Sequence, residues 1–125
     1  MATVDLNLEN FDSTIKGNNI VFVDYWAAWC GPCRMFAPTF EAASEANKDI
    51  VFAKVDTEDQ QQLAAMAGIQ SIPTLMIFKD EIIVFSQAGA LPASALDQLI
   101  EGAKALDMDE VRAQIAAERA DSSES

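Results

Sequence analysis

The chain has 125 residues, half of them hydrophobic, which is enough to build one domain with a proper core. Its formal net charge of −12 at pH 7 argues against nucleic acid or an anionic membrane surface as a partner, because both are bound by clustered Lys and Arg. Residues 1–6 lack the basic start and long apolar run of a secretory signal, and no stretch approaches the ~20 apolar residues of a membrane span, so we expect a cytoplasmic protein.

The first half of the chain predicts alternating helices and strands. In chain order they are a helix capped by Asn7 and ended by Gly17, a strand over 20–26, a helix over 33–47 and a strand over 50–56. The first helix places Leu8, Phe11 and Ile15 on one face. The strand over 20–26 is apolar on both faces except for Asp24, which is typical of a central buried strand. A strand, a helix and a strand in this order predict a right-handed crossover between parallel strands.

The second half predicts a hairpin between helices. In chain order we expect a helix after the capping box Thr57–Gln60 that ends at Gly68, strands over 74–78 and 82–86 joined by a tight turn, an amphipathic helix over 96–103, and a last helical stretch opened by Asp107 with Glu110. Residues 107–125 hold six acids and two arginines, and their larger apolar residues are Met108, Val111 and Ile115. Residues 122–125 are polar and are expected to be disordered.

The only two cysteines lie in the segment Trp29-Cys30-Gly31-Pro32-Cys33, where the first long strand gives way to a helix. Two thiols separated by two residues can close into a disulfide and reopen, which transfers two electrons. Unpaired N–H groups and the macrodipole at a helix start lower the pKa of a nearby thiol, and Arg34 adds a positive charge. We therefore expect Cys30 to be the exposed nucleophile that attacks a client disulfide. Cys33, one turn further on, would resolve the mixed disulfide.

Other uses of a cysteine pair are less suited to this composition. Half of a zinc site would need two more ligands, and the chain has no histidine and no third cysteine, so no metal site is expected. A purely structural disulfide would constrain little of the unfolded chain because its loop is so short. Pro32 suits the first turn of a helix and stiffens the loop between the thiols.

Over about residues 3–106 the chain resembles the thioredoxin family. The matching residues, in order and at similar spacing, are Asp24, Trp26-Ala27, Trp29 to Cys33, Lys54-Val55-Asp56, Ile72-Pro73-Thr74, Phe78-Lys79 and Gly89-Ala90. The resemblance implies an α/β fold with a central mixed β-sheet flanked by helices. It also implies a domain over residues 1–106, followed by an acidic extension over 107–125 that the family pattern does not include. Family members usually have a glycine in the hairpin turn, where this chain has Asp80-Glu81, so the type of that turn stays open.

The pair Gly31-Pro32 between the cysteines resembles the reducing members of the family. The resemblance implies a general protein disulfide reductase, a monomer without a bound cofactor that acts on disulfide-containing client proteins. Its electrons would come from NADPH through a flavoprotein thioredoxin reductase. Two other functions stay open at this point: a non-redox protein that holds a partner on the same surface, and a disulfide oxidase or isomerase in an oxidising compartment.

Asp24 is a charged residue within an apolar strand, so burial should raise its pKa. The resemblance implies that Asp24 is a general base that takes the proton of Cys33, with Lys54 tuning its pKa. The alternative is an ion pair between Asp24 and Lys54 with a structural role only.

Pro73 begins a predicted strand, where an ordinary trans proline would also fit. The resemblance implies a cis Ile72–Pro73 bond beside the disulfide, which would expose the backbone of Ile72 to an extended client segment. Gly89 and Ala90 would complete an apolar platform beside Trp29.

Overall fold

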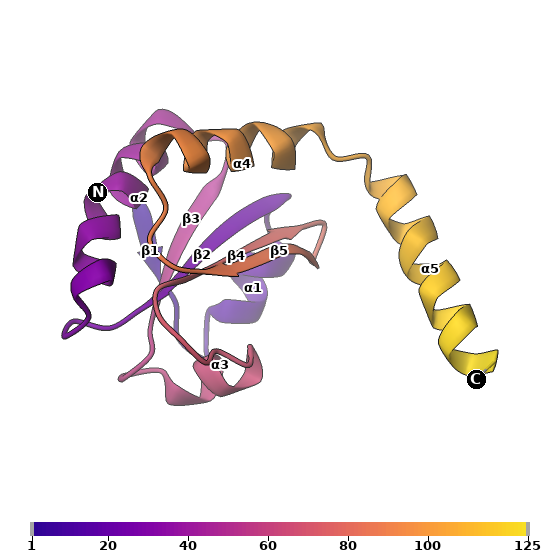
Figure 1. Ribbon diagram of the computed structural model, residues 1–125, viewed down its shortest axis with the longest axis horizontal. Helices are drawn as coiled ribbons and strands as arrows, with labels where there is room; N and C mark the ends of the chain where they lie inside the picture. Colours follow the sequence, from indigo (N-terminus) through magenta and orange to yellow (C-terminus); the bar gives the residue numbers. More distant parts are fainter. Residues whose placement is uncertain (1, 125) are drawn as a thin grey trace.

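The computed structural model of the protein describes residues 2–124 and the side chains of residues 2–121. Its centre is a five-stranded mixed sheet in the order β1-β3-β2-β4-β5 (Figure 1). The strands are β1 (Thr3–Asp5), β2 (Ile20–Trp26), β3 (Val51–Asp56), β4 (Thr74–Lys79) and β5 (Ile82–Ala88). β1, β3 and β2 are parallel, whereas β4 is antiparallel to β2 and β5 to β4. The helices are α1 (Phe11–Lys16), α2 (Gly31–Ala46), α3 (Gln61–Met66), α4 (Ala93–Ala105) and α5 (Met108–Glu124).

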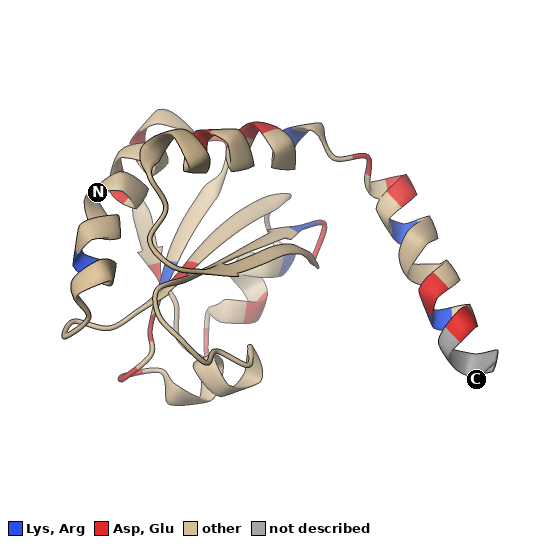
Figure 2. Ribbon diagram, viewed as in Figure 1, with Lys and Arg blue, Asp and Glu red and all other residues tan. Residues whose placement is uncertain are grey.

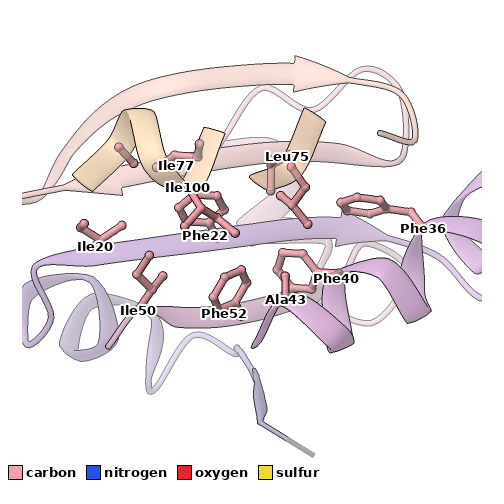
Figure 3. Close-up of a cluster of buried hydrophobic side chains, with 12 residues drawn as sticks. Ile20, Phe22, Phe36, Phe40, Ala43, Ile50, Phe52, Leu75, Ile77 and Ile100 are labelled. Carbon is pink, nitrogen blue, oxygen red and sulfur yellow. The ribbon is translucent and has the colours of Figure 1, made fainter. Parts of the chain in front are cut away.

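The sheet has a hydrophobic core on each face. On one face Phe22 and Phe52 of the sheet pack with Phe36 and Phe40 of α2 and with Ile100 of α4 (Figure 3). On the other face a second core joins strand residues to α1 and α3; its members include Ile15, Val21, Val23, Tyr25 and Leu63. Because side chains alternate along a strand, Asp24 lies on the same face as Phe22, the face that α2 covers.

The sheet and its connections largely follow the sequence-based predictions. The strand predicted over 20–26 matches β2, β2 and β3 are parallel as the crossover requires, and β4 and β5 form the expected hairpin. The central helix begins at Gly31, two residues before the predicted start, because Cys30 is its N-cap.

The predicted starts of two shorter helices are wrong. Asn7 Oδ1 accepts the N–H groups of Glu9 and Asn10, at 2.9 and 3.0 Å, and so caps a turn that precedes α1, which begins only at Phe11. Leu8 lies in that turn and is 55% exposed instead of facing the core.

The predicted capping box at Thr57–Gln60 does not form. Thr57 Oγ1 donates instead to the carbonyl oxygen of Trp26, at 3.0 Å. The N–H of Glu58 is bound by the Oδ1 of Asp56, at 3.0 Å. Helix α3 consequently begins only at Gln61, with Gln60 as an N-cap that makes no side-chain hydrogen bond to the helix.

The turn between β4 and β5 uses two non-glycine residues with positive φ, Asp80 at 52° and Glu81 at 68°. Asn19, which lies just before β2, makes two hydrogen bonds to this turn. Its side-chain amide donates to Asp80 Oδ1, and its carbonyl oxygen accepts the N–H of Asp80 at 2.9 Å. These bonds, together with the tolerance of aspartate for the left-handed region, account for a tight turn without glycine.

A buried lysine ties the hairpin to the end of α4. Lys79 Nζ donates to the carbonyl oxygens of Ala103, Lys104 and Leu106, at 2.7, 3.2 and 3.0 Å. One residue further along the chain, Asp80 pairs with Arg112 of α5 at 2.7 Å. We call Lys79, Asp80 and Arg112 the α4–α5 clasp.

Beyond the clasp, α5 extends away from the sheet (Figure 1) and carries both signs of charge along its length (Figure 2). Met108 in its first turn is nevertheless only 7% exposed, so the start of the extension packs on the domain. The disorder predicted for residues 122–125 falls on residues whose side chains lie outside the described part of the chain, and it stays a prediction. None of the helices within residues 2–124 is long and apolar enough to cross a membrane.

A chain that ends at Leu106 should keep its redox activity but lose about 1–2 kcal/mol of unfolding free energy. The expected loss corresponds to the burial of the Met108 side chain and an exposed ion pair. Urea unfolding of this chain and of one ending at Asp121, which retains the clasp, would measure it. An inactive chain ending at Leu106 would contradict the expected activity. An equal loss of unfolding free energy in the two truncated chains would contradict the stabilising role of the clasp.

Candidate active site

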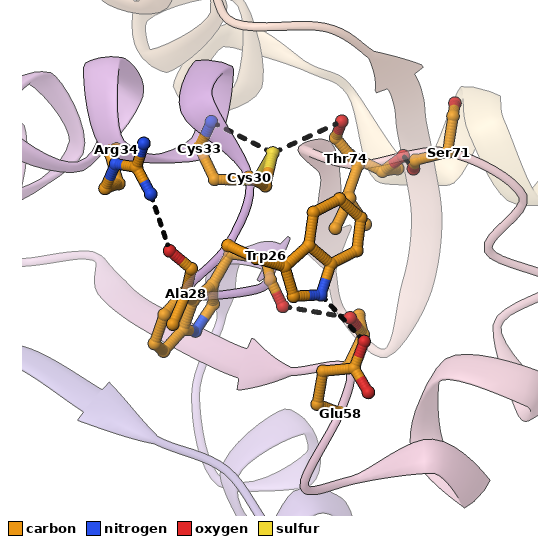
Figure 4. Close-up of a disulfide and its surroundings, with 11 residues drawn as sticks. Trp26, Ala28, Cys30, Cys33, Arg34, Glu58, Ser71 and Thr74 are labelled. Carbon is orange, nitrogen blue, oxygen red and sulfur yellow. Dashed lines mark hydrogen bonds between the residues drawn. A yellow bond between two sulfur atoms is a disulfide. The ribbon is translucent and has the colours of Figure 1, made fainter.

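The two cysteines meet at the start of α2. Cys30 and Cys33 form a disulfide with a Cα–Cα distance of 5.2 Å. Cys30 is the N-cap of the helix, and its Sγ accepts the N–H of Cys33 at 3.2 Å (Figure 4). In the reduced protein the same donor and the helix dipole would stabilise a thiolate on Cys30. Arg34 Nη1 donates to the carbonyl oxygen of Ala28 at 2.9 Å, which holds this cation on the loop before Cys30.

The expected difference in exposure between the cysteines is nearly absent in the disulfide form. Cys30 is 4% exposed and Cys33 is 2% exposed. What distinguishes them is position: Cys30 lines a surface cleft, and Cys33 is not among the residues that line it. A client can therefore approach the sulfur of Cys30 from the cleft, while that of Cys33 lies behind it.

The cleft has a volume of about 530 Å³ and two neutral walls. Trp29, Gly31 and Pro32 form one wall with Cys30; the other consists of Thr57, Ala64 and the run Ile69-Gln70-Ser71-Ile72. Trp29 is 66% exposed, in agreement with the surface position expected of it. A Cβ added at Gly31 would meet no atom within 4 Å, so glycine is not required there by packing and leaves the approach to Cys30 unobstructed.

The Ile72–Pro73 peptide bond is cis, and the Ile72 carbonyl oxygen lies 3.8 Å from Cys30 Sγ. Pro73 is joined to the loop after β5, because its carbonyl oxygen accepts the N–H of Gly89 at 2.8 Å. Gly89 has φ +108°, a conformation that favours glycine. Gly89 and Ala90 are exposed, as a platform requires, but they do not line the cleft itself.

Asp24 is 1% exposed, and neither of its carboxylate oxygens has a hydrogen-bond partner among the described residues. Burial raises the pKa of Asp24 to about 7, and the positive charge of Lys54, its partner in the register of β2 and β3, opposes that rise. Lys54 Nζ lies 4.7 Å from the ring centroid of Trp26. The alternative of an Asp24 satisfied by a direct bond from Lys54 is therefore not what the structure contains.

One feature of the site is missing from the sequence-based analysis. Trp29 Nε1 donates to Glu58 Oε1 at 2.8 Å, so a carboxylate is fixed at the rim of the cleft. Its position could have been anticipated, since Glu58 follows the carboxyl end of β3, and β3 is parallel to the strand that leads to Cys30. Among the described residues no group of three or more His, Cys, Asp or Glu could hold a metal ion.

A closing and reopening cysteine pair at a helix start, beside a cleft, defines a dithiol–disulfide oxidoreductase. The family model described as thioredoxin matches residues 2–102. A protein named putative thioredoxin 2 from Streptomyces coelicolor is 55% identical over 119 residues, which cover 95% of this chain and 89% of that protein. A thioredoxin from Alicyclobacillus acidocaldarius is 42% identical over 97 residues, covering 77% and 92%. The solved thioredoxin of Plasmodium falciparum superposes with a TM-score of 0.75 at 38% identity, covering 80% of this chain and 98% of that one.

The chain therefore belongs to the thioredoxin family, and it performs dithiol–disulfide exchange through Cys30 and Cys33 as a protein disulfide reductase. The similarity to the Streptomyces protein covers 119 of the 125 residues and so continues through most of α5. The extension is thus shared with at least one relative.

Proposed function

We propose that the reduced protein reduces client disulfides in two steps, with Cys30 as nucleophile and Cys33 as resolving thiol. The Cys30 thiolate attacks one client sulfur; a bond forms between them, the client S–S bond breaks, and the first client thiolate leaves and takes up a proton. Cys33 then loses its proton, attacks Cys30 Sγ and releases the second client thiol. Two electrons pass to the client, and the Cys30–Cys33 disulfide forms. The position of Cys30 in the cleft, with Cys33 outside its lining, carries this assignment.

Asp24 is the base that we assign to Cys33. Three observations support this assignment. Asp24 lies on the face of the sheet that α2 covers, and its carboxylate has no hydrogen-bond partner among the described residues. Its pKa of about 7 lets it accept and release a proton near neutral pH. Lys54 tunes that pKa downward through its charge.

The client segment would lie in extended form against the backbone of Ile72 and Pro73. Two observations support this placement of the client. Cys30 Sγ lies close to the Ile72 carbonyl oxygen, and the exposed residues Gly89 and Ala90 lie next to Pro73, whose carbonyl oxygen accepts the N–H of Gly89. Trp29, Gly31 and Pro32 would contact the client from the opposite wall.

We further propose that a flavoprotein thioredoxin reductase returns electrons from NADPH to the Cys30–Cys33 disulfide, and that the protein works as a cytoplasmic monomer with no bound cofactor. The support is family membership and the confinement of both cysteines to the redox motif. The domain boundary near Leu106 is part of the same proposal.

Turnover of insulin disulfides with NADPH and a thioredoxin reductase tests this function. The wild-type protein should support turnover, whereas Cys30→Ser and Cys33→Ser should each reduce the rate at least about 1,000-fold because neither can complete the two steps. Cys33→Ser should accumulate mixed disulfides with insulin chains, seen by non-reducing electrophoresis, and Cys30→Ser should not. Trapping by Cys30→Ser would reverse the two roles, and no turnover by the wild type would refute the reductase proposal.

A further inference from the structure

The part of the chain that supplies Thr57, Ala64 and residues 69–72 to the cleft contains no positively charged residue. Between Lys54 and Lys79 there is no Lys or Arg, but there are three acids, Asp56, Glu58 and Asp59. The segment that contains Gly89 and Ala90 has no cation either, because no Lys or Arg occurs between Lys79 and Lys104. Residues 69–73 and 88–90, along which a client segment would lie, are themselves uncharged, so the charged groups at the rim of the cleft decide what charge such a segment meets.

One carboxylate at the rim of the cleft is held in place by a hydrogen bond. Glu58 accepts the hydrogen bond of Trp29 Nε1 at 2.8 Å, which fixes its carboxylate at the rim, and Asp59 beside it is exposed. Arg34, the nearby cation, lies on the other side of Cys30, bonded to the Ala28 carbonyl oxygen (Figure 4). The charges around the site are thus asymmetric: the lining of the cleft is neutral, and Glu58 with Asp59 makes the rim negative on the side of Cys30 away from Arg34.

We propose that this negative side selects among clients: disulfides flanked by Lys or Arg are reduced faster than disulfides flanked by Asp or Glu, and Glu58 is the main specificity-determining residue. The proposal rests on the reductase function proposed above. Fixed charges at the rim of a site act chiefly on the rate of encounter with a charged partner, and salt screens them within about 10 Å at 0.1 M ionic strength. The selection should therefore appear in the second-order rate constant and fall with ionic strength.

The test uses two synthetic cyclic disulfide peptides of the same sequence, with two lysines or two glutamates beside the cysteines. Each is mixed with the chemically reduced full-length protein, and peptide thiols are measured after acid quench. At about 10 mM ionic strength we expect the lysine peptide to react about 5–10 times faster, and at 0.5 M less than about twice as fast.

At low salt, Glu58→Gln should lower the ratio of the lysine-peptide rate to the glutamate-peptide rate to about half of the wild-type value, because it removes the negative charge. The amide oxygen of glutamine can still accept the Trp29 hydrogen bond. The control is Glu101→Gln, which removes one exposed negative charge from α4, away from the cleft lining, and should leave the ratio within about 20% of wild type.

Equal rates for the two peptides at low salt would overturn the selection while leaving the reductase function standing. An equal effect of Glu58→Gln and Glu101→Gln would also overturn it, since only the net charge of −12 would then matter. If neither peptide is reduced, the proposed function itself fails.

Discussion

Replacing Asp24 with alanine should raise the free energy of unfolding at pH 8 by about 2–4 kcal/mol and slow client reduction near neutral pH. Asp24 is 1% exposed without a hydrogen-bond partner among the described residues, and burial raises its pKa to about 7. The ionised carboxylate therefore destabilises the folded protein. Its removal also leaves a small cavity, which offsets part of the gain.

The effect should depend on pH in a defined direction. The carboxyl has a pKa near 3.8 in the unfolded chain and about 7 in the folded one, so the unfolded state loses its proton first as pH rises. Folding is then opposed increasingly between about pH 4 and pH 7, and the penalty becomes constant above that window. Asp24→Ala should consequently gain little at pH 4, most of its final value at pH 7, and no more above pH 8.

Urea unfolding of both proteins from pH 4 to pH 9 would measure this profile, with stopped-flow reduction of a client disulfide as the second readout. Asp97→Ala, which removes an exposed acid of α4, is the matched control and should change stability by less than about 0.5 kcal/mol at every pH. If Asp24→Ala is less stable at pH 8, the carboxylate is a satisfied structural group, and the role of general base has to be withdrawn.

Lys79→Met should lower the free energy of unfolding by about 2–4 kcal/mol at neutral pH. The ammonium group of Lys79 is buried and donates to three carbonyl oxygens at the end of α4, of which only that of Ala103 also accepts a backbone N–H, from Leu106 at 3.4 Å. Methionine keeps the apolar stem but removes the charged donor from all three oxygens, and those of Lys104 and Leu106 then lose the side-chain donor that the structure gives them. Bonds to a charged donor contribute more than neutral ones, and unpaired buried acceptors carry a desolvation penalty.

The same substitution at Lys104 provides the control. Lys104 pairs with Asp49 at 3.3 Å, and its side chain is 35% exposed, so Lys104→Met should cost no more than about 1 kcal/mol. Chemical denaturation of the two variants under identical conditions would separate a clasp from an ordinary surface lysine. Equal losses would mean that water replaces Lys79 at the end of α4 without penalty.

The sequence predicts those features of the protein that depend on local pattern. The apolar run of β2, the Cys30–Cys33 spacing and the hairpin all follow from residues close together in the chain, and the structure contains each of them. The capping box predicted at Thr57–Gln60 fails for the opposite reason. Thr57 has a helix within reach, yet its hydroxyl binds the carbonyl oxygen of Trp26, 31 residues away.

Two further features lie beyond any local pattern. The bond from Trp29 to Glu58 joins residues 29 positions apart, and the bond from Lys79 to Ala103 joins residues 24 positions apart. From the sequence alone, a lysine at the end of an apolar strand would be assigned to the solvated surface. In the structure Lys79 is buried, because the end of α4 packs against it. The clasp could therefore be recognised only in three dimensions. Glu58 could be placed near the site from its position after β3, but its bond to Trp29 could not be predicted.

β5 ends the sheet on one side, and its residues Ile82 to Phe85 form a β-branched and aromatic run with Ile83 54% exposed. Such an edge offers backbone groups to any other copy that approaches in extended register. Mutual repulsion between copies of net charge −12 opposes this approach at pH 7. Near the isoelectric point of about 4.1 the net charge that causes this repulsion is lost, and we expect intermolecular strand pairing through β5 to promote aggregation. The acid arm of the Asp24 experiment therefore belongs at low protein concentration.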